Sequence, residues 1–157
     1  MDMLVSLYSL PSAEEELEKM SKRGIRIIRA FPPNRLQVVE WVKEHSSIYA
    51  AGEADCCFKS SNPTIFLAIK NEKIIGYACY NATAPDFFGP TEVIESEQGQ
   101  GVGRALLIAS LQALRDEGYG YAIIGGVGPA EFYKKSVGAI EIEGSSPGLY
   151  ENMLKMD

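Results

Sequence analysis

Hydrophobic and polar positions follow two different periods along this chain. Runs rich in β-branched and aromatic residues occupy 64–69 and 74–80, and the polar pair Asn71-Glu72 lies between them. This pattern predicts two antiparallel strands joined by a tight turn. Further strands are predicted at 3–10, 25–31, 87–94, 121–127 and 140–142. Within 87–94, Gly89-Pro90 removes a backbone donor, so we expect a bulge there.

Helices are predicted where apolar residues recur at three- and four-residue spacing. Ser12, which precedes three consecutive glutamates, indicates a helix cap. Gly118 and Gly138 mark helix ends. The predicted helices span 13–22, 34–45, 102–117 and 129–138. Residues 46–62 are compatible with either a short helix or a loop around 49–58.

Two of these helices have predicted apolar faces. In the helix over 34–45 the face is Leu36, Val39 and Val42, with Val38 and Trp41 beside it. In the helix over 102–117 the face is Val102, Leu106, Ala109 and Ala113, with Leu107, Leu111 and Leu114 beside it.

The order of strands and helices predicts a mixed α/β sheet with helices on both faces. A length of 157 residues suits one domain with a proper core. We expect three regions within it: a strand–helix extension over 1–24, an acceptor-side region over 25–62, and a core over 64–143.

Charge and composition narrow the function classes. Lys plus Arg is 15 against 21 for Asp plus Glu, so the net charge is −6. This balance argues against nucleic acid as a partner and favours cationic ligands such as amines. No apolar run approaches the ~20 residues of a membrane span, and no signal-peptide pattern is found, so we expect no membrane partner. The three cysteines are odd in number and lack the spacing of a disulfide framework, which favours a reducing cytoplasm.

The cysteine and histidine residues of the sequence do not indicate a metal site or a catalytic thiol. Cys56, Cys57 and Cys79 have neither disulfide-framework nor zinc-site spacing, and His45 is the single histidine. We therefore expect no metal site and no Ser-His or Cys-His catalytic pair.

A glycine-rich turn is the strongest functional motif. Residues 98–103 read Gln-Gly-Gln-Gly-Val-Gly and join a predicted strand to a predicted helix. Free N–H groups at such a helix start, together with the helix dipole, favour a bound phosphate. A P-loop is excluded because no Lys-Ser or Lys-Thr pair follows the glycines. A dinucleotide fingerprint is disfavoured because its third glycine is missing.

The remaining pattern, Gln98, Gly101 and Gly103, resembles the acyl-coenzyme A pyrophosphate loop of the GNAT superfamily of N-acetyltransferases. A second stretch about thirty residues on, Ala130-Glu131-Phe132-Tyr133 with Gly138 after it, resembles that family's other signature. The resemblance covers roughly residues 64–143 and implies a GNAT-type fold, a splayed mixed sheet flanked by helices. It also implies acetyl-coenzyme A as co-substrate, transfer of the acetyl group to a primary amine by direct attack in a ternary complex, and a homodimer as a common assembly.

Site residues follow from the same resemblance. Tyr133 occupies the position of the family's general acid. The strand residue Val93 is expected to bind the pantetheine arm and polarise the thioester through its backbone, with Glu95 beyond it. Glu92 is our first candidate for the general base, ahead of Asp86 and Glu53. The complete predicted cofactor-binding set is Val93, Ile94, Glu95, Gln98, Gly99, Gln100, Gly101, Val102, Gly103 and Arg104.

Two departures from the family pattern leave an alternative open. Gln98 stands where many relatives carry an arginine, which removes a cation from the loop. Residues 125–128, Gly-Gly-Val-Gly, occupy the stretch where many relatives carry an asparagine that contacts pantetheine. The alternative is a catalytically silent acyl-coenzyme A sensor or a protein-interaction module. The identity of the amine acceptor is not encoded in any motif.

Overall fold

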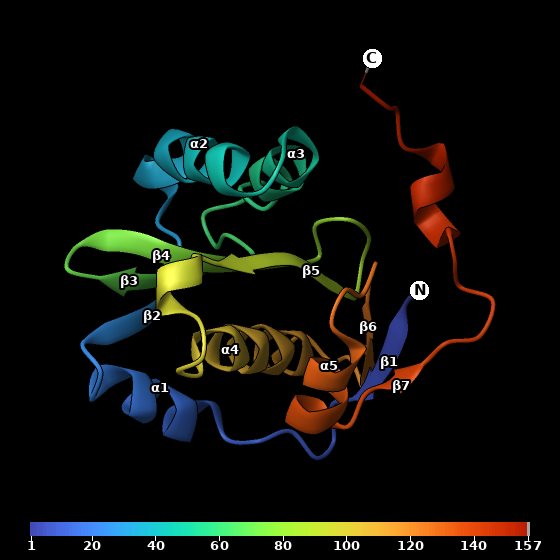
Figure 1. Cartoon of the computed structure of the whole chain (residues 1–157), viewed down its shortest axis with the longest axis horizontal. Coiled ribbons are helices and arrows are strands. Elements are labelled where there is room, and N and C mark those ends of the chain that lie inside the picture. Colours follow the sequence, from blue (N-terminus) through green and yellow to red (C-terminus); the bar gives the residue numbers. More distant parts are fainter. Residues whose placement is uncertain (157) are drawn as a thin grey trace.

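The computed structural model describes residues 1–156 and shows one seven-stranded sheet with helices on both faces, in the order β2-β3-β4-β5-β6-β1-β7 (Figure 1). The predicted mixed α/β sheet is confirmed. The helices α2 and α3 cover one face, and α1, α4 and α5 cover the other. None of the helices in residues 1–156 is long and apolar enough to cross a membrane.

The strands are short, and their bounds agree with the predicted runs to within a few residues. They are β1 Met3–Ser6, β2 Ile25–Arg29, β3 Ile65–Lys70, β4 Lys73–Tyr80, β5 Phe87–Val93, β6 Tyr121–Ile124 and β7 Ile140–Glu141. The α-helices are α1 Ala13–Ser21, α2 Arg35–His45, α3 Ile48–Cys56, α4 Val102–Asp116 and α5 Ala130–Val137. Three short 3-10 helices are η1 Pro32–Asn34, η2 Glu95–Glu97 and η3 Gly148–Asn152.

Local sequence accounts for most of these boundaries. Ser12 caps α1 by accepting a hydrogen bond from the Glu15 N–H, as predicted. Asn71 and Glu72, with φ of 52° and 61°, form the two-residue turn between β3 and β4. Gly118 and Gly138, with φ of 104° and 66°, end α4 and α5.

The sheet opens between β5 and β6. These strands are parallel neighbours, and they are paired only at Phe87 and Phe88. Beyond Phe88, Gly89 has φ of 118°, and Gly89-Pro90 lies opposite the single residue Cys79 of β4. The predicted bulge is therefore confirmed. It bends β5 away from β6, so the edge of β5 that faces β6 carries no neighbouring strand from residue 89 onward.

The first strand lies far from the second. β1 is antiparallel to both β6 and β7 and occupies the sheet between them, while β2 is the opposite edge strand. α1 and the segment before it connect the two ends by running along the face of the sheet that carries α4 (Figure 1). The strand β1 is fully integrated, since Met3 and Val5 are buried.

Packing against α1 makes the buried surface of α4 wider than the predicted apolar face. α4 is buried on more sides than a single face, because α1 and the sheet both pack on it. Ala109, which we had placed on the buried face, is half-exposed. The buried residues of α4 are Val102, Ala105, Leu106, Leu107, Ile108, Ser110, Leu111, Ala113 and Leu114.

Two further predictions are corrected in detail. The buried face of α2 is formed by Val38 and Val42, and Leu36 is 81% exposed, so the apolar stripe is rotated from the predicted one. The strand predicted over 121–127 ends at Ile124, because the following Gly125–Gly128 stretch leaves the sheet as a loop. The uncertain segment at 49–58 is helical as α3, where Ser47 accepts a hydrogen bond from the Ala50 N–H.

Candidate functional site

A cavity of about 860 Å³ begins at the opening between β5 and β6 and reaches the start of α4. Its lining comes from four parts of the chain: α3, the region from β5 to α4, the region from β6 to α5, and the segment after β7. The residues that line it are Glu53, Phe88, Gly89, Pro90, Thr91, Glu92, Val93, Gln98, Gly99, Gly101, Val102, Gly103, Arg104, Leu107, Ile124, Gly125, Gly126, Gly128, Pro129, Phe132, Tyr133 and Tyr150.

The glycine loop forms one end of this cavity. Gly99 and Gly101 have φ of 82° and 90°, a region that glycine adopts without strain. Gly101 is the N-cap of α4 and no side chain caps the helix. In residues 1–156, no acceptor is found for the N–H groups of Gly99 and Gly101. The loop therefore presents backbone donors and a helix N-terminus to the cavity, as an anionic ligand requires.

The free edge of β5 forms the middle of the cavity. The Ile94 N–H donates to the Ile75 carbonyl of β4 at 2.9 Å. Because successive backbone groups of a strand alternate in direction, the Val93 N–H points away from β4, toward the side that β6 has left. Val93 is thus placed to donate into the cavity. Its carbonyl accepts a hydrogen bond of 2.9 Å from the Gln98 side chain.

The polar side chains around the loop are largely engaged with one another. Arg104 lines the cavity, but its Nε is 3.1 Å from Oε1 of the buried Glu16 and its Nη1 donates to the Ser136 carbonyl. Gln100 donates to Glu97, which also pairs with Lys70 at 3.0 Å. This pairing with Lys70 lowers the pKa of Glu97. The loop is therefore shaped by its own side chains, and its backbone is left for a ligand.

Three residues of the predicted cofactor-binding set lie outside the lining. Ile94 directs its N–H into the sheet, Glu95 starts η2 with an exposed side chain, and Gln100 faces the other side of the loop. The other seven predicted residues line the cavity.

Tyr133 is brought to the same cavity from α5. Its side chain is buried, it contacts Phe88 and Phe132 edge to face, and it lines the cavity. Burial raises the pKa of its hydroxyl to about 12. Among the described residues this hydroxyl has no hydrogen-bond partner. A protonated donor therefore faces the cavity across the neutral pH range.

Two of the three candidate bases also reach the cavity. Glu92 projects from β5 and is exposed, and Glu53 projects from α3, where it accepts a hydrogen bond from the Thr83 hydroxyl. Asp86 does not line the cavity. It lies in the turn before β5 with φ of 64°, and burial together with the nearby Glu117 raises its pKa to about 6.

Sequence reasoning missed the residues that close the end opposite the glycine loop. Tyr150, from η3, lines the cavity next to Gly125 and Gly126. A Cβ built on Gly125 would lie 2.9 Å from the Tyr150 hydroxyl oxygen, so the two glycines make room for this ring. The glycine run was visible in the sequence, but nothing near Tyr150 indicates which distant loop it meets.

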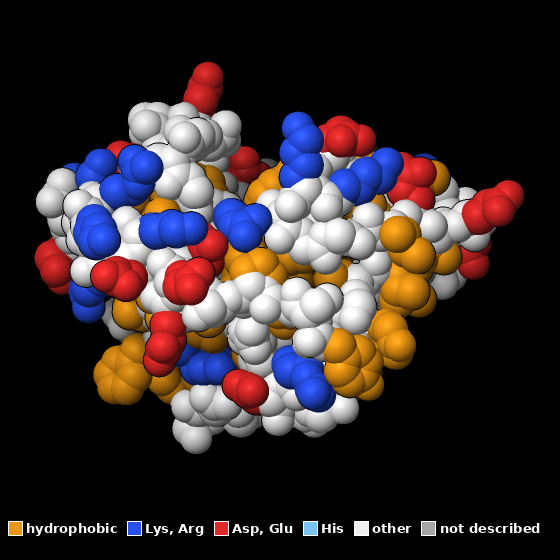
Figure 2. Space-filling view, turned by 90° about the horizontal axis from the view of Figure 1, so that it is seen from below, with side chains coloured by type: hydrophobic (Ala, Val, Ile, Leu, Met, Phe, Trp, Pro, Cys, Tyr) orange, Lys and Arg blue, Asp and Glu red, His pale blue; other side chains and the backbone are white. Residues whose placement is uncertain are grey.

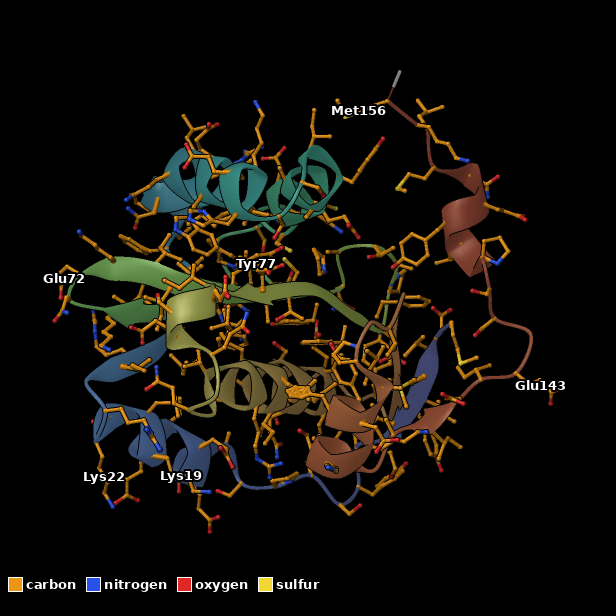
Figure 3. The ribbon with its side chains drawn as sticks, in the orientation of Figure 1. Lys19, Lys22, Glu72, Tyr77, Glu143 and Met156 are labelled. Carbon is orange, nitrogen blue, oxygen red and sulfur yellow. The ribbon has the colours of Figure 1, made fainter. Side chains whose placement is uncertain are left out.

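A second, smaller cavity of about 450 Å³ adjoins the loop on the side of α1. It shares Gly101 and Arg104 with the first and is otherwise lined by Gln100 and by residues of α1 and the turn after it: Glu16, Lys19, Met20, Lys22 and Arg23. Lys19 and Lys22 extend outward from α1 (Figure 3). On the face that carries α1 and α5, hydrophobic side chains show at the centre between Lys and Arg side chains on either side (Figure 2).

The cysteines contribute nothing to the cavity lining within residues 1–156. Cys57 and Cys79 are buried between the sheet and the α2–α3 layer, and Cys56 is half-exposed. Burial raises the pKa of the Cys79 thiol well above its usual value. No group of three or more metal-ligating side chains is found in the described residues.

Comparison with known proteins gives one consistent result. The model of the acetyltransferase (GNAT) family matches residues 23–139. A GCN5-related glucosamine N-acetyltransferase region of a fungal multi-domain GH3 β-N-acetylglucosaminidase is similar in structure, with a TM-score of 0.69 at 12% identity, covering 87% of this chain and 19% of that chain. A GCN5-related N-acetyltransferase from Sphaerobacter thermophilus has a TM-score of 0.59 at 18% identity, covering 88% of this chain and 47% of that one.

These two structures support the fold at low sequence identity. This chain spans about a fifth of the length of the first and about half of the second. Comparison with curated protein sequences gives no match.

Proposed function

The chain belongs to the acetyltransferase (GNAT) family, and from this premise we propose that it transfers the acetyl group of acetyl-coenzyme A to a primary amine by direct attack in a ternary complex. One observation carries the proposal. A single cavity joins the glycine loop, the free edge of β5, a carboxylate on β5 and the Tyr133 hydroxyl. These are the parts that phosphate binding, thioester polarisation, proton removal and leaving-group stabilisation require.

The binding of acetyl-coenzyme A is supported by backbone groups. The N–H groups of Gly99, Gly101 and the first turn of α4 suit a pyrophosphate, and the edge of β5 suits an extended pantetheine arm that pairs like an added strand. Acetyl-coenzyme A supplies the acetyl thioester. The Val93 N–H, which points into the cavity, is the donor proposed to stabilise the oxyanion that forms on the thioester carbonyl.

The proton steps are assigned to two side chains. Glu92 takes a proton from the acceptor ammonium, directly or through water, and the freed amine forms the new carbon–nitrogen bond. The nitrogen of the tetrahedral intermediate then loses its second proton to solvent, the carbon–sulfur bond breaks, and the thiolate leaves beside the Tyr133 hydroxyl. With a pKa of about 12, this hydroxyl remains protonated and donates to the sulfur. A coenzyme A thiol, with a pKa of about 8.5 like that of cysteine, is a good leaving group once it has such a donor.

Direct transfer is favoured over an acetyl-enzyme. A covalent route needs a nucleophile in contact with the thioester, and the cysteines of the described chain do not line the cavity. The acetyl group is therefore proposed to pass straight to the amine.

The test is isothermal titration of coenzyme-stripped protein with acetyl-coenzyme A, with NAD as the control ligand, followed by a screen of primary amines for thiol release. D-Glucosamine belongs in that screen because of the amino-sugar enzyme region that resembles this fold. We expect micromolar binding of acetyl-coenzyme A alone and amine-dependent release of coenzyme A. Binding without turnover of any amine would support the silent sensor instead. Absence of binding would refute both.

A further inference from the structure

The end of the cavity opposite the glycine loop is lined by acidic and aromatic side chains. Its charged lining residues are Glu53 and Glu92, and its aromatic wall is Tyr150. We propose that the acceptor is a small amine that carries a second positive charge, and that Glu53 and Tyr150 bind this second charge. The inference rests on the proposed acetyl transfer and deepens it by naming the substrate class.

The charges at this end have one sign. Among the described lining residues Arg104 is the cationic one, and it lies at the glycine loop, held by Glu16. Glu92 on β5 is the cross-strand partner of Tyr77 on β4, whose ring is buried under the α2–α3 layer, and Glu53 comes from α3 in that layer. Because directly paired strand residues point to the same face of a sheet, Glu92 and Glu53 lie on the same side of β4. A ligand here meets two carboxylates and no compensating cation.

The two carboxylates have different surroundings. Glu92 is on the strand whose edge receives the thioester, and it is the proposed base. Glu53 is half-buried and its Oε2 accepts a hydrogen bond from Thr83, which holds the side chain in place. A fixed, partly desolvated carboxylate is a binding group for a cation, because less of its charge is screened by water. Glu53 is therefore proposed to bind the second ammonium group of the acceptor, the one that is not acetylated.

The Tyr150 side chain lines the same end of the cavity. Burial raises the pKa of its hydroxyl, with smaller contributions from the nearby charges of Glu53 and Asp2. Its side chain fits against Gly125 and Gly126, whose built Cβ atoms would lie 2.9 Å from the hydroxyl oxygen and 3.3 Å from ring atom Cε2, respectively. An aromatic ring beside a carboxylate attracts an ammonium group through its negative face.

The segment that carries Tyr150 is tied down on both sides. The Gly126 N–H donates to Asp2 Oδ1 at 2.9 Å, and the Asp2 N–H donates to Ser145 Oγ at 2.7 Å. Farther along, the Met156 N–H donates to the Tyr49 hydroxyl of α3 at 2.8 Å. The segment after β7 therefore bridges from the sheet to α3 (Figure 3). It lies beyond residue 139, outside the part matched by the family model.

The chemistry of this end discriminates between classes of amine. An amine with a second ammonium group satisfies both Glu53 and the Tyr150 ring. A simple alkylamine offers Glu53 no positive charge, so the carboxylate keeps only its hydrogen bond from Thr83 and this amine gains no binding energy there. An amino acid places its own carboxylate against Glu53 and Glu92, and like charges at short range repel.

The test compares three acceptors that each contain four carbon atoms: 1,4-diaminobutane, butylamine and 4-aminobutyrate. Thiol release is measured at saturating acetyl-coenzyme A and constant pH and salt. We expect kcat/KM to fall in that order, by about tenfold at each step. A series of α,ω-diamines with three to six carbons then locates the second charge.

Variants of Glu53 and Tyr150 test whether these residues bind the second ammonium group of the acceptor. Glu53→Gln keeps a hydrogen-bond acceptor for Thr83, and it should reduce the preference for the diamine over butylamine, measured as the ratio of the two kcat/KM values, from about tenfold to near one. Tyr150→Leu, which keeps an apolar side chain without the ring, should act in the same direction. Glu44→Gln, an exposed charge on α2, is the matched control for net charge and should keep the full preference.

Two outcomes would overturn the inference, and they are distinguishable. If amines are acetylated without preference for the diamine, or if 4-aminobutyrate is preferred, the substrate class is wrong and acetyl transfer stands. If acetyl-coenzyme A binds but no amine is turned over, acetyl transfer itself fails, and the substrate class fails with it.

Discussion

Tyr133 is the proposed general acid, so the proposal predicts how its replacement changes turnover. We expect Tyr133→Phe to lower kcat about 100-fold and to leave the affinity for acetyl-coenzyme A within about twofold, because the ring contacts with Phe88 and Phe132 stay while the donor is lost. Tyr121→Phe, on an exposed ring outside the cavity, is the control. Unchanged turnover in Tyr133→Phe would remove this hydroxyl from the mechanism.

Asp86 gives a prediction about stability against pH. Its pKa is raised to about 6 from an ordinary value of 3.8, because burial disfavours the charged form and Glu117 repels it. The folded state therefore holds a proton that the unfolded state releases, so this group makes the protein less stable as pH rises from about 4 to about 6. Its Oδ1 has no partner among the described residues, which agrees with an unfavourable charge.

Asp86→Asn should remove that cost. Asparagine tolerates the positive φ at this position, so the backbone need not change. Because the side chain is half-exposed, we expect a gain of only about 1 kcal/mol at pH 7. The gain should vanish below pH 4. Thermal melts across pH 3.5–8 measure it, with Glu40→Gln as a surface-charge control. A gain that persists at pH 3.5 would contradict the titration argument.

Gly76 illustrates how one element positions another. A Cβ built on this β4 residue would lie 2.9 Å from the Glu92 carbonyl oxygen and 3.2 Å from Val93 Cγ2. Gly76→Ala must therefore push β5 away from β4. We expect a loss of about 2–3 kcal/mol in the free energy of unfolding and weaker binding of acetyl-coenzyme A, because the free edge of β5 shifts.

Gly52→Ala is the matched control for that substitution. Gly52 lies inside α3, and a built Cβ has no atom within 4 Å. The same change should stabilise the protein there by up to about 1 kcal/mol, because alanine is the better helix former. Urea unfolding midpoints measure both. If Gly76→Ala raised the free energy of unfolding, β5 would have to shift to accommodate the Cβ without loss of stability, which would contradict the prediction.

Some features of the helices and strands could be predicted from the sequence, and others could not. Capping at Ser12, the turn at Asn71-Glu72 and the bulge at Gly89-Pro90 were predictable, because each depends on a few neighbouring residues. The glycine loop was predictable for the same reason. The rotated face of α2 was not, because Leu36 and Val38 are both apolar and only the position of the sheet decides between them.

At the scale of the whole molecule, contacts between residues that are distant in the sequence could not be predicted from local patterns. The cavity end built by Glu53 and Tyr150 joins residues almost one hundred positions apart, and no local periodicity encodes such a meeting. The pairing of β1 between β6 and β7 is of the same kind. The family model starts at residue 23 and does not include β1, yet the buried Met3 and Val5 make this strand part of the core.

The position of β1 has a consequence for the order in which the protein can assemble on the ribosome. Met3 is paired with Ile124 and Leu4 with Ile140, so β1 pairs with β6 and β7, which are both synthesised after β2 to β5. At ~5–20 residues per second, roughly 6–24 s pass between the synthesis of the first strand and that of β6. Throughout that interval a short apolar strand waits without a neighbour while β2 to β5 are completed. The sheet can therefore grow from its β2 edge toward β6, and β1 takes its place between β6 and β7 only in the last step.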